Sequence, residues 1–493
     1  MKIILAGFNI DYDMIQGIQS SSSKLDNLTP ETISAAYARI SRNPLPVNEL
    51  RKISRKEVGK ARKSNEAIVF DMGHSSVAEH AVFNIDILGV SRLIVEEIEK
   101  FRLSSFTEKS QRYIHLENDF VIPEEIKNSG FEVPFVETVR AQYRLYHDLY
   151  GALKKYVFDK YGDMAADPAN HSTLEGWAKE DARYVISLAT EAQLGMTINA
   201  RSLELMLRRS AAHPLEEVRK YGSSLYEAAK PIAPSLVRYT EATPYEKITR
   251  PSLRERSSEL IARHGRTALK NERLLITDGN VTLVSSTPDA DNRLLASLLH
   301  GSSDLPMERC LSYVSRMSDR EKKDFITTAF RHMEAYDSPL REFETVDLTY
   351  DIVLSSSCFA QMKRHRMATI ISQDYDPDLG VTIPPSIREV DMEDPFSKMI
   401  EKTEELYQRL KNAQSPAAAP YILTNAHRKR IALTVNAREL YHISRLREDR
   451  HAQWDIRETA EAMVRLAKGV MPLTLMMAGG KDAFPSLRND VTA

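Results

Sequence analysis

The sequence has very little cysteine and no long hydrophobic run, and each absence excludes a class of protein. Cys310 and Cys358 are the only cysteines in 493 residues, which is too few for a disulfide framework and lacks the spacing of a metal site. No stretch approaches the roughly 18 apolar residues of a membrane-spanning helix, and Asn9 interrupts the apolar start too early for a secretory signal. The formal net charge of −2 does not suit a protein that coats nucleic acid or a membrane surface. We expect a cytoplasmic protein with neither of these partners.

The length and composition predict two folded domains. A hydrophobic content of 42% and a charged content of 28% are typical of globular proteins, and the chain is too long for one ordinary domain. Residues 241–271 contain Pro244, Pro251 and many charges, as a joint would. We predict a first domain at residues 1–240, a linker at residues 241–271 and a second domain at residues 272–493.

The two halves of the sequence repeat one plan. Residues 73–123 and 335–385 each contain a polar turn, an alternating strand, a helix, a cationic cluster and an Ile-Pro pair, and Asn199-Ala200-Arg201 recurs as Asn436-Ala437-Arg438. When the copies are aligned on the cationic cluster, the first keeps a Ser-x-Arg sequence and lacks Arg-His-Arg, and the second does the reverse. A period this long indicates duplication of a whole domain. The complementary losses suggest one active site assembled from both copies.

Hydrophobic periodicity predicts matching elements in the two halves. Residues 81–88 alternate as a strand that Gly89 ends, and Ser91 is placed to cap the next helix; residues 345–354 and a helix starting at 355–357 are their partners. The pattern further predicts strands at residues 3–8 and 281–284, and helices at residues 31–40, 55–70, 135–160, 175–230, 396–413 and 428–471. The predicted fold class is α+β, with two homologous domains that each pack a β-sheet with several long helices.

Several motifs resemble those of the flavin-dependent thymidylate synthases. His74-Ser75-Ser76-Val77-Ala78-Glu79-His80 and Ser110-Gln111-Arg112-Tyr113 lie in the first half, and Arg364-His365-Arg366 in the second is similar to the start of the family signature R-H-R-x-x-S. The block Asn436-Ala437-Arg438, with residues 451–457 downstream, is similar to the family's second block. The resemblance covers most of both halves, so the chain looks like a fused tandem of two such subunits.

The resemblance implies two sets of residues that bind dUMP, because the family is a homotetramer whose sites lie between subunits. One set is a Gln and an Arg at the R-H-R motif and an Arg after N-A-R that stabilises the ionised uracil. It corresponds to Gln361, Arg364 and Arg447, where the first half has Glu97, Lys100 and Ser210. The other set corresponds to Glu108, Ser110, Gln111, Arg112 and Arg183, where the second half has Ser372, Asp374, Asp376 and Pro420.

The substitution of Asp376 for an arginine decides which combination can hold a phosphate. Arginine binds phosphate through paired, charge-assisted hydrogen bonds. An aspartate there reverses the sign of an interaction of about 4 kcal/mol at about 4 Å and an effective dielectric of ~20. One combination of the two sets is therefore expected to form a complete nucleotide site, and the other is expected to exclude the nucleotide.

The resemblance also implies a site for FAD, and it is not of the Rossmann type because the sequence has no G-x-G-x-x-G. The residues that correspond to the family's flavin contacts are Ser76, Glu108, Asn199, Arg201, Arg364, His365, Arg366, Asn436 and Arg438. The family carries an Asn four residues beyond the N-A-R arginine; Leu205 and His442 replace it here, and we assign His442 to the flavin site. Arg364-His365-Arg366 is expected to be three adjacent cations that need an anion.

The implied function is the reductive methylation of dUMP to dTMP, with FAD as cofactor and methylenetetrahydrofolate and NADPH as cosubstrates. Arg447 would be catalytic, because it would stabilise negative charge on the pyrimidine ring. The implied assembly is a homodimer that forms a pseudo-tetramer, with the live site either within one chain or between two chains. Two alternatives stay open: flavin-dependent modification of another pyrimidine nucleotide, and a non-catalytic nucleotide-binding protein. No metal is expected, since His74, Glu79 and His80 lack a zinc-site pattern.

Overall fold

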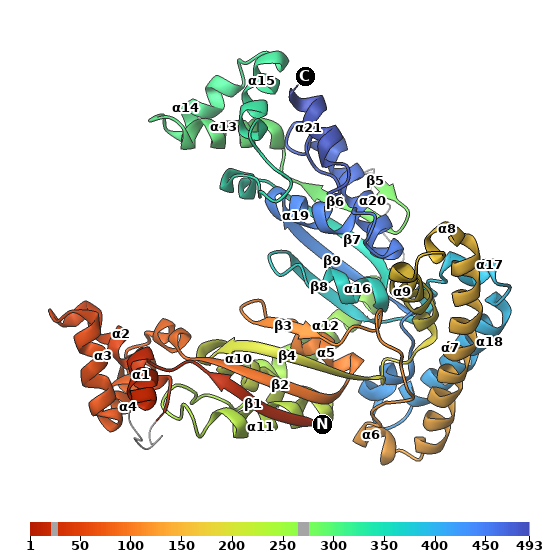
Figure 1. Cartoon of the computed structure of the whole chain (residues 1–493), viewed down its shortest axis with the longest axis horizontal. Helices are drawn as coiled ribbons and strands as arrows, with labels where there is room; N and C mark the ends of the chain where they lie inside the picture. The colour runs from red at the N-terminus through yellow and green to blue at the C-terminus, as the bar shows by residue number, and fades with distance from the viewer. Residues whose placement is uncertain (21–27, 265–275, 493) are drawn as a thin grey trace. The chain divides into compact units, whose positions relative to one another are not determined.

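The computed structural model describes residues 1–20, 28–264 and 276–492 (Figure 1). Its residue contacts divide the chain into two compact units: the first unit comprises Met1–Asp148, Ile186–Ala268 and Pro395–Leu423, and the second unit comprises Leu149–Val185, Leu269–Asp394 and Thr424–Ala493. Each unit thus takes a segment from the other half of the sequence. The domain boundaries at residues 240 and 272 stay a prediction, and residues 265–271 of the predicted linker lie outside the described residues.

The first unit is built around an antiparallel sheet with the strand order β1-β2-β4-β3 (Figure 1). The side chains of Phe83, Ile85 and Ile87 on β2 are buried, whereas Asn84 and Asp86 between them are exposed, so one face of the sheet is apolar. The strands are β1 (Lys2–Phe8), β2 (Val82–Ser91), β3 (Ser105–Glu108) and β4 (Glu191–Asn199). The helices α10 (Ala200–Ala211) and α11 (Glu216–Ala229) pack against this sheet.

The second unit is built around a sheet with the strand order β5-β6-β7-β9-β8. Its strands are β5 (Ile276–Asp278), β6 (Val281–Ser286), β7 (Asp347–Ser355), β8 (Thr369–Tyr375) and β9 (Arg428–Asn436). Helices α16 (Ser356–Met362), α19 (Ala437–Arg447) and α20 (Trp454–Val470) pack with one another and with the sheet. These helices and β7 to β9 carry most of the residues that the sequence assigns to the second half of the site.

The two sheets share their topology and their irregularities. The pairing of β1 with β2 shifts between Leu5 and Gly7, and the pairing of β6 with β7 shifts at the equivalent place, between Leu283 and Ser285. The order β6-β7-β9-β8 repeats the order β1-β2-β4-β3, and β5 is an addition. An α+β architecture with two homologous sheets, as the sequence predicts, is confirmed for the described residues.

The remaining helices surround these sheets within each unit. In the first unit they are α1 (Tyr12–Ser20), α2 (Glu31–Arg39), η1 (Ile40–Arg42), α3 (Val47–Lys56), α4 (Val58–Glu66), η2 (Ala67–Asp71), η3 (Ser75–His80), α5 (Arg92–Ile98), α6 (Glu124–Lys127), α12 (Pro244–His264) and η8 (Pro416–Ile422). In the second unit they are α8 (Gly162–Ala165), η4 (Pro168–Asn170), α9 (His171–Ala182), η5 (Arg183–Val185), α13 (Ala290–Gly301), α14 (Met307–Val314), α15 (Asp319–Phe330), η6 (Arg341–Thr345), η7 (Pro377–Leu379), α17 (Pro385–Glu389) and α21 (Phe484–Thr492). Two of the unit boundaries fall within α7 (Glu132–Lys160) and α18 (Glu393–Lys411).

Most predicted elements are confirmed, and three predictions are wrong. Residues 175–230 and 428–471 are not continuous helices, because β4 and β9 interrupt them. In β4 the buried side chains recur at every second residue, which is the period of a strand and not of a helix. Gly89 does not end β2: the strand continues to Ser91 through a register shift, with Gly89 in the left-handed region at φ 69°, which glycine adopts at little cost.

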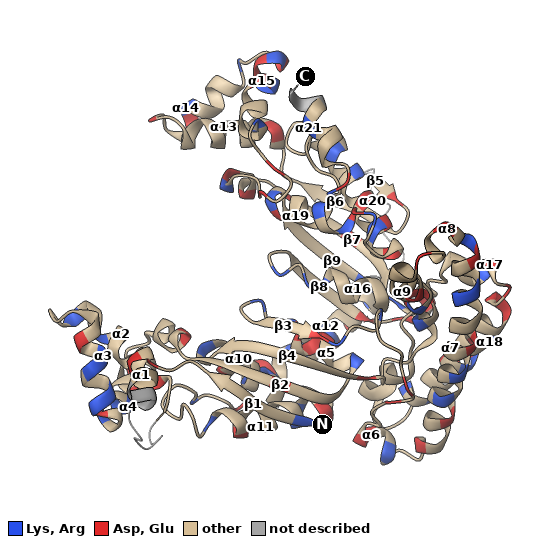
Figure 2. Cartoon of the chain, viewed as in Figure 1, with Lys and Arg blue, Asp and Glu red and all other residues tan. Residues whose placement is uncertain are grey.

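Charges of both signs are interspersed along the helices (Figure 2). Helix α15, for example, carries Lys and Arg beside Asp and Glu, and its capping box at Ser318 and Glu321 satisfies the first backbone N–H groups. Across residues 1–20, 28–264 and 276–492, no helix combines the length and apolarity needed to cross a membrane.

Candidate functional site

The Arg-His-Arg segment forms a turn directly after α16. The backbone N–H of His365 donates to Met362 O and that of Ala368 donates to His365 O, so the chain reverses before β8. This turn exposes the side chains of Arg364 and Arg366 and buries His365, which is 3% exposed. Two exposed guanidinium groups therefore flank one buried imidazole.

Hydrogen bonding fixes the protonation of His365. Nε of Arg447 donates to Nε2 of His365 at 2.9 Å, and since a guanidinium only donates, Nε2 must carry a lone pair. Burial, together with the charge of Arg447, lowers the pKa of His365 well below its ordinary value. His365 is therefore neutral, and the expectation of three adjacent cations is wrong: the segment carries two charges.

The guanidinium of Arg447 is anchored at two points. Besides its bond to His365, it donates from a terminal nitrogen to the backbone O of Gln361 at 3.2 Å. Arg447 lies at the C-terminal end of α19, and Gln361 lies in the last turn of α16. The second unit thus brings three predicted residues, Gln361, His365 and Arg447, into direct contact, and Arg364 lies on the same turn.

A chain of side chains leads away from Gln361. Its Nε2 donates to Oε1 of Gln453 at 3.3 Å, Nε2 of Gln453 donates to the hydroxyl of Tyr184 at 2.9 Å, and that hydroxyl donates to Oδ2 of Asp455 at 2.9 Å. Ser355, which caps α16, also donates to Asp455. Gln453 and Tyr184 are buried, with exposures of 1% and 0%. This network holds α16, the start of α20 and η5 in a fixed arrangement.

Arg183 belongs to this second unit, although its position is in the first half of the sequence. It begins η5, directly before Tyr184, is 7% exposed, and donates from Nε to Glu180 O at 3.2 Å. Its charge acts on Asp455, the residue at which the chain from Gln361 ends. The structure therefore places Arg183 in the same unit as Gln361 and Arg447.

Glu108, Ser110, Gln111 and Arg112, which the resemblance assigns to nucleotide binding together with Arg183, lie in the first unit. Glu108 ends β3 and faces Arg92 at 3.5 Å, with both side chains buried. In the following turn the backbone N–H of Arg112 donates to Oγ of Ser110 at 3.1 Å, and the guanidinium of Arg112 lies 5.5 Å from the ring centre of Tyr113. Gln111 lies between Ser110 and Arg112 in this turn.

The N-A-R blocks have a structural role at the start of a helix. Asn199 caps α10 by accepting from the backbone N–H of Ser202, and Asn436 caps α19 by accepting from that of Glu439, both at 2.8 Å. Their assignment to the flavin stays a prediction, beside this capping function.

The other residues assigned to the flavin are divided between the units. Arg201 pairs with Glu79 in the first unit, where Ser76 lies in η3. In the second unit Arg438 pairs with Glu344 at 2.7 Å. The arginines of both N-A-R blocks thus carry an ion pair with a carboxylate of their own unit.

His365, Glu439 and His442 form a cluster whose ligand-type atoms all lie within 4.8 Å of one another. Nδ1 of His365 faces Oε1 of Glu439 at 3.5 Å, and the rings of His365 and His442 meet edge to face with centroids 5.6 Å apart. Since Arg447 donates to Nε2 of His365, Nδ1 carries the proton. A metal would need the lone pair that this proton occupies, so the hydrogen bond from Arg447 disfavours metal coordination through Nδ1 of His365.

Sequence reasoning missed Tyr184 and gave Gln453 and Asp455 no separate role. Tyr184 follows Arg183 at the end of a helix and has no motif around it. For the other two, a polar residue directly before a helix is the usual N-cap signal, but the predicted continuous helix over residues 428–471 hid the start of α20 at Trp454. Gln453 is the N-cap of α20 and accepts from the backbone N–H of Ile456.

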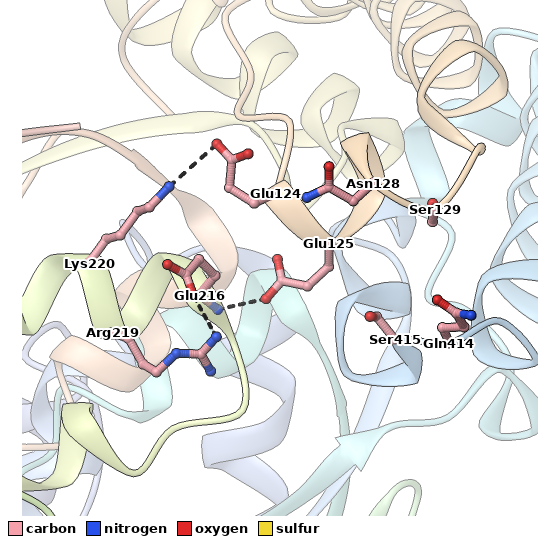
Figure 3. A pocket seen from close by; sticks show the side chains of 9 residues that line it. All are labelled: Glu124, Glu125, Asn128, Ser129, Glu216, Arg219, Lys220, Gln414 and Ser415. Atoms are coloured by element: carbon pink, nitrogen blue, oxygen red, sulfur yellow. Dashed lines mark hydrogen bonds and ion pairs between the residues drawn. The ribbon is translucent and has the colours of Figure 1, made fainter.

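A polar pocket of about 450 Å³ lies in the first unit and contains none of the predicted site residues (Figure 3). Its charged side chains are already paired: Lys220 with Glu124 at 3.4 Å and Arg219 with Glu216 at 2.5 Å. Glu125 accepts from the backbone N–H of Glu216 at 2.6 Å. Because its cations are neutralised within the pocket, we do not assign the nucleotide to it.

Glu448, next to Arg447, makes stability depend on pH. Burial raises the pKa of Glu448 from 4.5 to about 7. An acid with a raised folded-state pKa loses stability as pH rises, because the unfolded state ionises first. Glu448→Gln is expected to raise the free energy of unfolding at pH 8 by on the order of 2–3 kcal/mol, and this gain should shrink toward pH 5. Urea denaturation at both pH values measures it, with Glu308→Gln on the exposed face of α14 as control; an equal gain at pH 5 and pH 8 would contradict the assignment.

Comparison with known proteins identifies one family. The family described as thymidylate synthase complementing protein matches residues 25–235 and residues 282–473. A UPF0159 protein of Thermoplasma acidophilum is 21% identical over 495 residues, covering 89% of this chain and 93% of that protein. A flavin-dependent thymidylate synthase of Clostridium tetani is 29% identical over 216 residues, covering 43% of this chain and 82% of that protein.

Among solved structures, the chain is similar to a flavin-dependent thymidylate synthase of Helicobacter pylori, crystallised with FAD and dUMP. The sequence identity is 18%, the match covers 49% of this chain and 100% of that chain, and the TM-score is 0.32. A score this low supports no residue-by-residue comparison. The family match, which occurs once in each half of the sequence, is the stronger finding.

Proposed function

Because the chain belongs to the thymidylate synthase complementing protein family, as a fused tandem of two diverged copies, we propose that it catalyses the flavin-dependent reductive methylation of dUMP to dTMP. FAD is the proposed cofactor, with methylenetetrahydrofolate and NADPH as cosubstrates. The observation that carries the proposal is the anchored Arg447: its guanidinium is held by His365 and by the backbone of Gln361, in the motif that the family uses for the pyrimidine.

The residues of this chain have separate roles in the proposed reaction. Arg447 stabilises negative charge that develops on the pyrimidine ring, and its two anchoring bonds keep it in place without reorganisation. Gln361 and Arg364 bind the nucleotide beside Arg447. Arg112, Arg183 and the turn at Ser110 bind the phosphate through charge-assisted hydrogen bonds.

The donor set of the second unit fits a flavin with a phosphate-bearing tail. Arg364 and Arg366 are exposed and charged, whereas the buried His365 between them is neutral, so the turn offers two cations to an anion and one uncharged ring beside them. FAD would supply the hydride chemistry, held by these residues with Ser76, Asn436 and Arg438. We further propose that the protein is a cytoplasmic homodimer that forms a pseudo-tetramer.

A flavin titration tests this proposal directly. FAD fluorescence is expected to change on addition of the purified protein, with saturation below tens of micromolar. Arg366→Ala should weaken FAD binding by about tenfold or more, because it removes one of the two cations. The control Arg388→Ala, an exposed arginine of the same unit that pairs with Glu393, should bind FAD as the wild type does. Absence of binding at tens of micromolar would rule out a flavin enzyme.

One departure from the family keeps a second function open. His442 replaces the family's asparagine and lies against His365. The two relatives that match most of the chain are named UPF0159 protein, and this name states no activity. We therefore retain flavin-dependent modification of another pyrimidine nucleotide as the alternative. FAD binding without formation of dTMP from dUMP would favour it, and nucleotide binding without FAD binding would favour a non-catalytic protein.

A further inference from the structure

The imidazole of His365 lies between two side chains of one helix. Helix α19 carries Glu439 in its first turn and Arg447 at its last residue. Nε of Arg447 donates to Nε2 of His365 at 2.9 Å, and Oε1 of Glu439 faces Nδ1, the other ring nitrogen, at 3.5 Å. His365 and Glu439 are both buried. A donor therefore stands at one ring nitrogen and a carboxyl oxygen stands at the other.

The single proton of the neutral ring needs an acceptor on the Glu439 side. Because Arg447 donates to Nε2, the proton is on Nδ1, and among the described residues Nδ1 makes no hydrogen bond. A buried N–H without an acceptor is costly. The separation of 3.5 Å is longer than an ordinary N–H···O bond, and the oxygen of Glu439 still attracts the N–H. In a histidine, the contact made by one ring nitrogen decides which nitrogen carries the proton.

The role open to Glu439 requires an oxygen and not a charge. Burial raises the pKa of Glu439 above its ordinary value, and His442 and Arg438 act in the opposite direction. Arg438 is already paired with Glu344 at 2.7 Å. A raised pKa favours the neutral carboxyl group, whose carbonyl oxygen accepts from an N–H as a carboxylate oxygen does. A glutamine at this position would keep that oxygen.

The first copy of the repeat lacks every part of this arrangement. The positions of His365, Glu439 and Arg447 are occupied there by Phe101, Ser202 and Ser210. Ser210 donates to the backbone O of Met206 at 2.8 Å, so its hydroxyl is bonded within its own helix. The carboxyl side chain thus occurs in the copy that has an imidazole and a guanidinium to position, and it is missing from the copy that has neither.

Resting on the proposed function, we propose that Glu439 is a positioning residue for Arg447. Its oxygen holds His365 in the tautomer with the proton on Nδ1, and the lone pair of Nε2 then anchors the guanidinium of Arg447 beside the nucleotide. Glu439 acts on the reaction through His365 and Arg447.

The tautomer of His365 gives a test that does not depend on activity. Nitrogen NMR of protein labelled at histidine distinguishes the two tautomers, and His365→Asn identifies the signals of His365 among the 13 histidines. The wild type and Glu439→Gln are expected to carry the proton on Nδ1. Glu439→Leu keeps a good helix former without an oxygen, and it should give a mixture of tautomers. A wild-type spectrum in Glu439→Leu overturns the proposal.

Kinetics measure the consequence for Arg447. Glu439→Leu is expected to lower kcat by about tenfold or more, because a displaced catalytic group costs rate steeply, and to change the Kd for dUMP by less than about threefold. Glu439→Gln should stay within about threefold of the wild type in both quantities, since it keeps the acceptor. Ser202→Ala, at the equivalent position of the first copy, is the control and should have the kcat of the wild type.

A double variant separates positioning from packing. If Glu439 acts through Arg447, Glu439→Leu should cause no further loss of kcat when Arg447 is already alanine. A full additional loss in that background, or equal losses in Glu439→Gln and Glu439→Leu, overturns the proposal. If Glu439→Leu does not fold, Glu439→Met, which is unbranched like glutamate, decides by the same measurements. Absence of dTMP formation by the wild type overturns the proposed function, and the tautomer comparison then decides this inference by itself.

Discussion

Replacement of Arg447 by alanine is expected to lower kcat by about a hundredfold to a thousandfold, with the Kd for dUMP changed only a few-fold. The negative charge that Arg447 stabilises develops on the pyrimidine as the reaction proceeds, so its loss removes an interaction made chiefly in the transition state. The magnitude is that of removing one preorganised donor from an anion-stabilising site. Steady-state kinetics and calorimetry on the same preparation measure the two quantities.

A neighbouring arginine gives the matched control. Arg445 is 8% exposed, donates to the backbone O of Ala335 and packs over Phe484 with its guanidinium carbon 4.5 Å from the ring centre. Its contacts are structural, so Arg445→Ala should lower the free energy of unfolding and leave kcat of the folded fraction within a few-fold. If both variants lowered kcat equally, or if Arg447→Ala weakened binding as much as turnover, the catalytic role of Arg447 would be refuted.

Arg447→Lys refines this test. Lysine keeps the positive charge and cannot make two planar, parallel bonds, so it should lose the simultaneous contacts to His365 and Gln361. Activity between that of the wild type and that of the alanine variant would indicate that charge and fixed orientation both contribute. If Arg447→Lys lost as much activity as Arg447→Ala, the effect would be due to the fixed orientation of the guanidinium.

The duplication and the α+β class could be predicted from the sequence because they depend on patterns that a single chain displays. Ser91 is predicted as a helix cap and residues 355–357 as the start of the partner helix; both are confirmed, and Ser91 and Ser355 each accept a backbone N–H as N-caps. The strands β4 and β9 were missed because helices precede and follow them closely. In β4 the apolar residues Ala192, Leu194, Met196 and Ile198 alternate cleanly, so the strand signal was present and the helical patterns on either side obscured it.

The division of the chain between the two units and the protonation of His365 could not be predicted from the sequence in the same way. Nothing local to Arg183 or Tyr184 indicates that they pack in a different unit from Arg112, because such packing depends on contacts distant in sequence. The neutral state of His365 depends on its burial and on a guanidinium 82 positions away in the chain. A sequence motif specifies residue types, whereas protonation is set by their surroundings.

The registers of the two sheets confirm which residues correspond between the copies. Glu108 pairs with Leu194 in the first unit and Ser372 pairs with Ile431 in the second. Leu194 and Ile431 each lie five residues before the asparagine of their N-A-R block. Glu108 and Ser372 are therefore equivalent positions by backbone geometry, independently of any alignment of side chains.

The last prediction follows from this equivalence and concerns stoichiometry. Four residues beyond Glu108 and Ser372, respectively, the chain has Arg112 and Asp376. The side chain of Asp376 accepts from the backbone N–H of Asp378 at 3.1 Å, and counted along the sequence it stands at the position of Arg112. The guanidinium of Arg112 attracts a phosphate, whereas the carboxylate of Asp376 repels it. We expect calorimetry at saturating FAD to give one dUMP for each chain.

Two variants at the equivalent positions make the expectation sharp. Arg112→Ala removes a charge-assisted phosphate contact and should weaken dUMP binding by roughly 2–5 kcal/mol, which is thirtyfold or more in Kd by the usual conversion of about 1.4 kcal/mol for each tenfold. Asp376→Ala should leave both the affinity and the ratio of one unchanged, because its copy also lacks the partner arginine, with Pro420 at the position of Arg183. Two nucleotides for each wild-type chain, or equal losses in the two variants, would show that both copies bind and that the arginine-to-aspartate exchange does not determine which one does.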